Sequence, residues 1–348
     1  MVSDIELTDA ELCERLGAML TKQLRVSTAV SGYNRLAGGY SRHMARFEAC
    51  VGGTAIAMVA RTDQDDAHTL VRFDSVDEWE LLSTLTQHRV SFAPTARLYD
   101  TAGTIGGRAT MILDFVVGDG LSAALADESH DQELLVAAVC DLAAQIHRFD
   151  IDALPATMPR PESWTAYISS CVEQWRRMDA DHVESNPFIR YIAAWLDAHR
   201  PTTGPLVLLH GDLQPPNLVL TGDGTLVAVD WEFAHIGDPR EDLGWLQMIE
   251  GYSTTRTYGR DPEAFCARYR EATGLNEDVI NPAAVSYFSI LALGRIFASL
   301  YGQIGDLARG TNRSISVAYS AAAAITAAHP VWLQQIEALT AHSLEARP

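Results

Sequence analysis

The chain has 348 residues and a formal net charge of −19, with 47% hydrophobic and 20% charged residues. This is the composition of a globular protein that is long enough to form two domains. The negative charge argues against nucleic acid or an anionic membrane surface as a partner, and it tolerates or favours a cationic small molecule. The five cysteines are odd in number and show no CxxC spacing, which indicates reduced core thiols and argues against a disulfide framework or a zinc site.

The start of the chain and its hydropathy bear on location. The first residues are acidic and lack the basic start and apolar centre of a secretion signal. No apolar run reaches the length needed to cross a bilayer. We therefore expect a cytoplasmic protein with no membrane partner. Lys22 is the single lysine beside 25 arginines, so arginine must fill any role that normally needs a lysine deep in the fold.

The N-terminal third is predicted to be rich in β-structure. Thr8 and Glu11 match a capping box that begins an amphipathic helix at about 8–23. Alternating apolar residues and glycine turns predict five strands around one further helix, with strands at 28–36, 42–50, 54–61, 95–100 and 108–114 and the helix at 75–87. Residues 1–117 are therefore expected to form a small domain with a five-stranded antiparallel sheet.

Beyond residue 118 the hydrophobic pattern becomes helical. Apolar residues with helical spacing predict helices at 134–149, 161–180, 185–200, 241–251, 261–273, 281–305 and 313–340. Two of these helices lie in an insertion at about 160–203, and their tryptophans are expected in the core. The predicted architecture is α+β, with a large helical domain at 118–348 after the small β-rich one.

Polar residues stand at the ends of apolar runs between residues 205 and 230. The runs cover 205–209, 218–220 and 226–229, and the polar residues that end or separate them are His210-Gly211-Asp212, Gly222-Asp223-Gly224 and Asp230. The last two runs predict a hairpin. Residues equally far from its turn lie about 5 Å apart, which makes Asn217 and Asp230 neighbours. Asp212 can reach the same volume from a loop that two prolines stiffen.

Two carboxylates and one amide are thus expected to converge. Oxygen ligands without His or Cys suit Mg²⁺, which keeps waters and phosphate oxygens in its other positions. One acid then remains as a possible base. Each residue alone could equally make a turn with its own backbone, as Asp and Asn in loops often do. His210 is expected to brace the loop by hydrogen bonding.

These residues resemble the protein-kinase-like superfamily, and most closely its aminoglycoside phosphotransferase branch. His210-Gly211-Asp212 with Asn217 is similar to the catalytic loop of that branch, and Asp230-Trp231-Glu232 is similar to its metal motif. The resemblance implies a bilobal kinase-like fold over about residues 28–300, with Asp212 as the catalytic base or the residue that orients the hydroxyl, and with Asn217 and Asp230 as the Mg²⁺ ligands. Gln214 stands where the branch commonly has a second histidine, and Pro216 where it commonly has glycine.

The same resemblance assigns a phosphate grip to the small domain. In related kinases the third strand carries a lysine or arginine that binds the nucleotide phosphates and pairs with a glutamate on the next helix. Arg61 takes that place by position, although a solvated residue at a strand end is the plainer interpretation. Glu78 is the expected partner, but Ser75 and Glu78 also match a capping box, in which the glutamate would serve only the helix start.

Two further segments are similar to nucleotide contacts of the kinase-like fold. The glycine turn before Ser41 resembles the loop that approaches the phosphates, although the glycines alone favour a simple hairpin turn. Asp114-Phe115-Val116 resembles the hinge at which backbone groups bind adenine. Ser41, Asp114 and Val116 are therefore expected to lie at the nucleotide.

The resulting prediction is a small-molecule kinase. It would use ATP, or GTP, with Mg²⁺ to phosphorylate a hydroxyl group of a small molecule. An aminoglycoside, a macrolide, an amino alcohol or a hydroxyacyl compound are all compatible substrates, and a monomer or a homodimer is expected. The alternative is a nucleotide-binding regulatory protein of the same fold without turnover.

Overall fold

The computed structural model describes residues 7–36, 42–63, 75–180, 187–251 and 256–310, and most of the helical residues between 319 and 337. The contacts within the chain divide it into two compact units, Met1–Gly118 and Asp119–Pro348. No helix in the described ranges is both long and apolar enough to cross a membrane.

The N-terminal unit is built on a five-stranded antiparallel sheet with the strand order β1-β2-β3-β5-β4. Its elements are α1 (Asp9–Leu24), β1 (Thr28–Leu36), β2 (Arg42–Val51), β3 (Thr54–Asp63), α2 (Ser75–Gln87), β4 (Ala96–Asp100) and β5 (Thr110–Asp114). The predicted capping box is present, since the Thr8 side chain accepts from the Glu11 N–H and the Glu11 carboxylate accepts from the Thr8 N–H. Each predicted element of this unit is found within two residues of its expected bounds.

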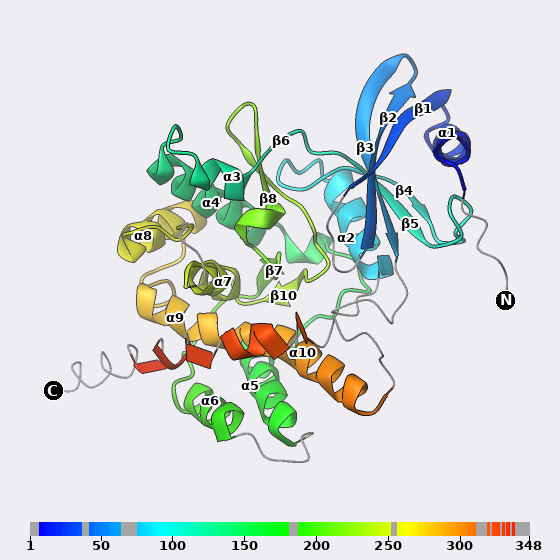
Figure 1. Cartoon of the computed structure of the whole chain (residues 1–348). Coiled ribbons are helices and arrows are strands. Elements are labelled where there is room, and N and C mark those ends of the chain that lie inside the picture. Colours follow the sequence, from blue (N-terminus) through cyan, green and yellow to red (C-terminus); the bar gives the residue numbers. More distant parts are fainter. Residues whose placement is uncertain are drawn as a thin grey trace. The chain divides into compact units, whose positions relative to one another are not determined.

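The two helices of this unit lie on opposite sides of the sheet (Figure 1). Leucines of α1 pack on one face, in a cluster with Phe47, Met58 and Ile112. Side chains alternate between the faces of a strand, so the other face of β2 and β3 carries Arg42 and Arg61, the latter opposite Met44 in the register. The helix α2 covers this second face with Glu78.

The C-terminal unit is mainly helical, with two small sheets. Its helices are α3 (Leu121–Ala126), α4 (Gln132–His147), α5 (Trp164–Ala180), α6 (Pro187–Ala198), α7 (Arg240–Glu250), α8 (Pro262–Thr273), α9 (Pro282–Leu291) and α10 (Leu293–Ala308), with short 3-10 turns at Ile151–Ala153 and Pro215–Asn217. Its strands are β6 (Gly118–Gly120), β7 (Val207–Leu209), β8 (Leu218–Thr221), β9 (Leu226–Ala228) and β10 (His235–Gly237), in sheets of order β6-β8-β9 and β10-β7.

One predicted helix is divided. The sequence indicated a single helix at 281–305, but the structure breaks it at Ala292 between α9 and α10. The indole of Trp175 donates to the carbonyl oxygen of Leu291 at 3.4 Å, and a Cβ on Gly294 would lie 2.4 Å from the same indole nitrogen. A side chain inserted into the helical hydrogen-bond ladder interrupts it, and this contact comes from a distant part of the chain.

Candidate active site

The loop that follows β7 has a backbone conformation that requires glycine. Gly211 has a φ of 79°, in the left-handed region that disfavours side chains. A Cβ there would also lie 2.2 Å from the carbonyl oxygen of Phe233. The loop therefore lies directly against the segment after β9, which β7 also contacts by pairing with β10.

A buried acid on α7 binds the backbone of this loop. The Asp242 carboxylate accepts the backbone N–H of His210 at 2.8 Å and that of Gly211 at 2.9 Å. His147 on α4 lies 3.1 Å from the same carboxylate. Burial raises the pKa of Asp242, but its interactions with His147 and with His210 outweigh burial, so that its pKa is lowered. Asp242 thus acts as a fixed anion that positions the loop backbone.

His210 connects the loop after β7 with the segment that follows β9. Its Nε2 lies 3.0 Å from the Val229 carbonyl oxygen, and its Nδ1 accepts the backbone N–H of Asp212 at 3.3 Å. A ring that donates from Nε2 and accepts at Nδ1 is the neutral tautomer. The bracing role expected from the sequence is therefore the role seen in the structure.

Asp212 is a buried carboxylate surrounded by amides. Gln214 Nε2 lies 2.8 Å and 2.9 Å from its two oxygens, and Asn217 Nδ2 donates to Oδ2 at 2.7 Å. Burial raises the pKa of Asp212 to about 7, because these neutral donors only partly offset it and the Asp230 charge adds to it. The buried indole N–H of Trp245 also lowers this pKa, without forming a normal hydrogen bond. A carboxyl group that titrates near neutral pH is suited to general-base chemistry.

The predicted metal ligands come from the hairpin, with a corrected register. Leu218 pairs with Ala228 and the Val229 N–H donates to the Asn217 carbonyl at 2.8 Å. Asn217 therefore lies opposite Val229, one residue before Asp230, because the turn is centred on Asp223. Asp230 has a φ of 67°, a left-handed conformation that is uncommon for residues other than glycine and is often found at functional sites.

The donor set at this position fits Mg²⁺. The Asn217 Nδ2 donates to the backbone oxygen of Asp212 at 3.0 Å and to its carboxylate, which occupies both amide hydrogens and leaves the Oδ1 of Asn217 as the available ligand atom. Asp230 adds a carboxylate close enough to affect the pKa of Asp212. In the described ranges no group of three or more acidic, His or Cys side chains could hold a metal. A hard cation here would therefore depend on water and phosphate oxygens for its remaining ligands.

The small unit contains a buried cluster of one acid and two arginines. The two Glu78 carboxylate oxygens accept from Arg61 and from Arg42, one oxygen for each guanidinium. All three residues are at most 6% exposed. Burial raises the pKa of Glu78, but the charges of Arg61 and Arg42 outweigh it, and the pKa is lowered. Both carboxylate oxygens of Glu78 are thus used in ion pairs.

Arg42 was not predicted as a site residue. It lies two residues before Met44, the cross-strand partner of Arg61. Residues two apart on a strand share a face, and diagonal neighbours on adjacent strands lie within reach of long side chains. The hairpin register thus contains the signal, since it places Arg42 and Arg61 on the same face beside α2.

The predicted hinge, Asp114-Phe115-Val116, lies at the end of β5. The Asp114 side chain binds Arg97 through two hydrogen bonds of 2.7 Å and 2.6 Å, and its N–H donates to the Thr95 carbonyl at 2.9 Å. The Phe115 N–H donates to the Ala57 carbonyl at 2.9 Å. Within the described part of the chain, no protein group binds the backbone N–H or C=O of Val116. Ser41, the remaining predicted residue, lies outside the described residues.

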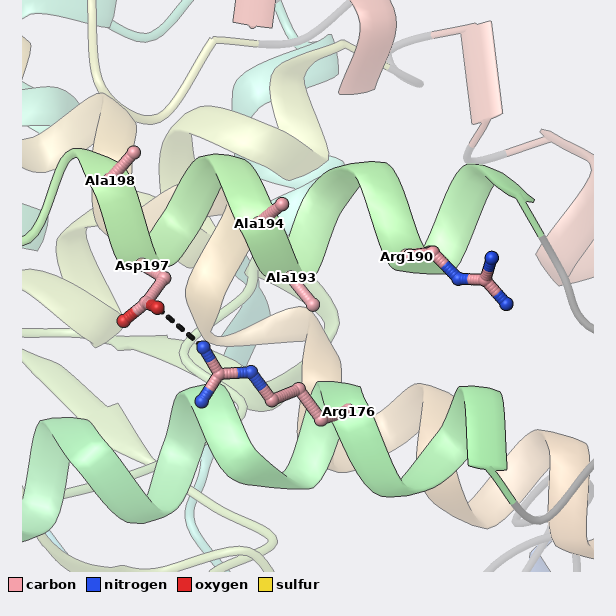
Figure 2. Close-up of a pocket in the computed structure, with 6 residues that line it drawn as sticks. All are labelled: Arg176, Arg190, Ala193, Ala194, Asp197 and Ala198. Atoms are coloured by element: carbon pink, nitrogen blue, oxygen red, sulfur yellow. Dashed lines mark hydrogen bonds and ion pairs between the residues drawn. The ribbon is translucent and has the colours of Figure 1, made fainter.

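A separate surface hollow lies between α5 and α6 (Figure 2). It has a volume of about 410 Å³, and an ion pair between Arg176 and Asp197 crosses it. The pair is about half exposed, so water screens it and its contribution to stability is small. None of the predicted site residues lines this hollow.

Three comparisons connect this geometry to known proteins. The chain is similar to a protein from Ralstonia eutropha assigned as an aminoglycoside phosphotransferase, with a TM-score of 0.66, 18% identity and coverage of 94% of this chain and 98% of the other. It is also similar to the aminoglycoside phosphotransferase APH(4)-Ia in complex with ADP and hygromycin B, with a TM-score of 0.60, 15% identity and coverage of 92% and 98%. A mouse protein, acyl-CoA dehydrogenase family member 10, is 26% identical over 121 residues, which are 34% of this chain. The chain spans only 11% of the length of that curated relative.

These likenesses confirm the predicted α+β, protein-kinase-like fold. A model of the phosphotransferase enzyme family (APH) matches residues 32–282. That match covers more than half of the chain and includes the loop at 210–217, the hairpin and the cluster around Glu78. The chain therefore belongs to the phosphotransferase enzyme family.

Proposed function

We propose that the protein transfers the γ-phosphoryl group of ATP, or of GTP, to a hydroxyl group of a small molecule, with Mg²⁺ as the cofactor. The observation that carries this proposal is the Asp212 carboxylate, which is buried, oriented by two amides and titrates near neutral pH. Phosphoryl transfer depends on positioning and on charge neutralisation more than on covalent chemistry. A rigidly held base next to two oxygen ligands supplies the first of these.

The residues of the loop and the hairpin have separate tasks in this proposal. Asp212 orients the acceptor hydroxyl and receives its proton. Asn217 and Asp230 hold Mg²⁺, which when bound neutralises charge on the phosphate oxygens. His210 and Asp242 keep the loop backbone in place, so that the base need not reorganise during the reaction.

The small unit supplies the proposed nucleotide contacts. Arg61 binds the phosphates, and Glu78 orients its guanidinium group. Glu78 accepts from both guanidinium groups, and Arg42 is also paired with Asp63, whose carboxylate lies 3.3 Å from its Nε. The backbone N–H and C=O of Val116 are proposed to bind adenine, while the Asp114 side chain stays bound to Arg97. Ser41 is proposed to lie near the phosphates.

The acceptor is proposed to be a soluble small molecule, and a cationic one is favoured by the net charge of −19. Aminoglycosides and amino alcohols have that charge. A macrolide and a hydroxyacyl compound complete the panel of candidate acceptors. The proposed location is the cytoplasm, where ATP and Mg²⁺ are available.

The test is a transfer assay with MgATP and this panel, in which ³¹P NMR identifies a new phosphomonoester. We expect one class of acceptor to be phosphorylated, and we expect Asp212→Asn to lower the rate at least about 100-fold, the usual contribution of a general base. Nucleotide affinity should stay unchanged in this variant. Asp223→Asn is the matched control, because Asp223 is an exposed acid in the hairpin turn and should keep full activity.

The alternative function, a regulatory protein that binds nucleotide without turnover, makes a different prediction. The wild-type protein would then bind MgATP tightly and form no phosphomonoester with any acceptor. Asp212→Asn would change neither binding nor product. That result would overturn the proposed reaction.

A further inference from the structure

Gln214 contacts the proposed base directly, and the proposed function gives it no task. Its Nε2 lies 2.8 Å from Oδ1 and 2.9 Å from Oδ2 of Asp212. One amide nitrogen at nearly equal distances from both oxygens bridges them. Gln214 therefore restrains the rotation of the carboxylate about its Cβ–Cγ bond.

The remaining contacts of Asp212 are unequal on its two oxygens. Oδ2 accepts from Gln214 and from Asn217, the latter at 2.7 Å. Among the described residues, Gln214 is the side chain that donates to Oδ1. The indole N–H of Trp245 affects the carboxylate without a hydrogen bond of normal geometry. Each carboxylate oxygen has two lone pairs, so Oδ1 keeps one for a further donor.

We propose that Gln214 is a positioning residue for phosphoryl transfer, whose amide spans both oxygens of Asp212 and leaves a lone pair of Oδ1 to receive the acceptor hydroxyl. This inference rests on the proposed function. In the transfer step the hydroxyl oxygen forms a bond to the γ-phosphorus, the bond from that phosphorus to the β,γ-bridging oxygen breaks, and the hydroxyl proton passes to Oδ1 of Asp212.

Loss of the Gln214 amide would free the Asp212 carboxylate to turn about its Cβ–Cγ bond. The step that suffers is the transfer of the hydroxyl proton in the bound complex, whereas the acceptor and the nucleotide are bound mainly by other groups. Removal of Gln214 should therefore lower kcat more than it raises KM.

The first experiment measures kcat and KM separately for the wild type and for Gln214→Ala. Gln214→Ala should lower kcat about tenfold or more, because the base is no longer held in the orientation for proton transfer, while KM for the acceptor changes by less than about twofold. Gln247→Ala is the matched control, since this glutamine binds Ser286 and not Asp212, and it should keep the kcat of the wild type.

A second experiment needs no acceptor. The free energy of unfolding in urea is measured for the wild type, Gln214→Ala, Asp212→Asn and the double variant, and the coupling between the two sites is calculated. We expect the two changes to be non-additive, because the two side chains contact each other directly.

The two experiments separate failure of the inference from failure of the proposed function. If the wild type turns over but Gln214→Ala lowers kcat no more than it raises KM, or if the two changes are additive, the inference about Gln214 is wrong while the phosphotransferase proposal stands. If the two changes are coupled but the wild type forms no product, the proposed function fails and the positioning role fails with it.

Discussion

Asp212 in the C-terminal unit and Glu78 in the N-terminal unit are both buried carboxylates, with exposed fractions of 9% and 3%. Burial raises the pKa of each acid. The net shifts are nevertheless opposite, upward to about 7 for Asp212 and downward for Glu78. The difference lies in the hydrogen-bond partners, which are amides for Asp212 and guanidinium groups for Glu78.

This difference separates two uses of a buried acid. Neutral donors orient a carboxylate but repay little of its lost hydration, so it can exchange a proton near neutral pH. Cationic donors fix the charge, so the acid becomes a permanent anchor for the arginines. For these two acids the charge of the partners matches the direction of the pKa shift, and the following changes test this rule for them.

The largest expected effect comes from removal of the Glu78 charge. Glu78→Gln leaves Arg42 and Arg61 buried without an anion between them, and breaking a buried pair in this way costs about 3–5 kcal/mol. The measurement is the free energy of unfolding in urea near neutral pH. Glu48→Gln, at an exposed position of the same sheet, should change it by less than about 0.5 kcal/mol. Equal small losses for both variants would contradict the rule.

The second effect is the pH dependence of stability that Asp212 causes. Its sign is opposite to that expected for an acid with a lowered pKa, such as Glu78. Between the ordinary pKa of 3.8 and the folded value of about 7, the folded protein holds a proton on Asp212 that the unfolded chain has lost. The contribution of this group to the free energy of unfolding therefore decreases as pH rises through that range, by up to about 4 kcal/mol.

Asp212→Asn removes this dependence. Relative to the wild type, the variant should gain stability progressively from about pH 4 to about pH 8.5, while it loses transfer activity. The check is urea unfolding of both proteins across this pH range. A difference between them that does not change with pH would show that Asp212 has an ordinary pKa in the folded protein.

These pKa directions depend on contacts that the sequence could only partly predict. Local signals gave the helix at 75–87 and the strands around it, because caps, glycine turns and alternation are written in neighbouring residues. The motif around Asp212 and Asn217 was likewise visible. The structure adds the contact of Gln214 with the Asp212 carboxylate and that of Arg42 with Glu78. The sequence did not show these contacts, because they depend on where the side chains point from their strand or loop.

Other features depended on distant segments. Trp175 interrupts the helix predicted at 281–305 from more than a hundred residues away. The strand β7 pairs with β10, whose three residues carry too short a pattern to indicate a strand. Asn217 lies opposite Val229, and not opposite Asp230, because the turn is centred on Asp223. The glycines on both sides of Asp223 did not show where the turn has its centre.

The third prediction gives Asp212 a guanidinium partner, like the partners of Glu78. Gln214→Arg places a guanidinium group at the Asp212 carboxylate, where an opposite charge should lower the pKa of Asp212 by about 1–3 units. The acid limb of kcat/KM should then move to lower pH, and the pH dependence of stability should weaken. Gln214→Ala shifts the limb in the other direction and serves as the control. A limb that moves upward in both variants would show that the charge of the partner does not set the pKa.

The smallest effect is expected at a third carboxylate, which has a cationic partner but less burial. Asp114 binds Arg97 in a bidentate pair, with exposed side-chain fractions of 24% and 29%. Water screens such a pair, so Asp114→Asn should reduce the free energy of unfolding by about 1 kcal/mol or less. It should also leave MgATP affinity unchanged, because the proposed adenine contacts are backbone groups of Val116.

Val116→Pro provides the contrast, since proline removes the backbone N–H at that position. This variant should weaken MgATP binding by about tenfold, the effect of one lost hydrogen bond, as measured by isothermal titration calorimetry alongside urea unfolding. If Asp114→Asn weakened nucleotide binding as much as Val116→Pro, the Asp114 side chain would belong to the nucleotide site. The pair of Asp114 with Arg97 would then contribute to nucleotide binding, as is proposed for Glu78 with Arg61. The lower burial of Asp114 would not give it a different role from Glu78.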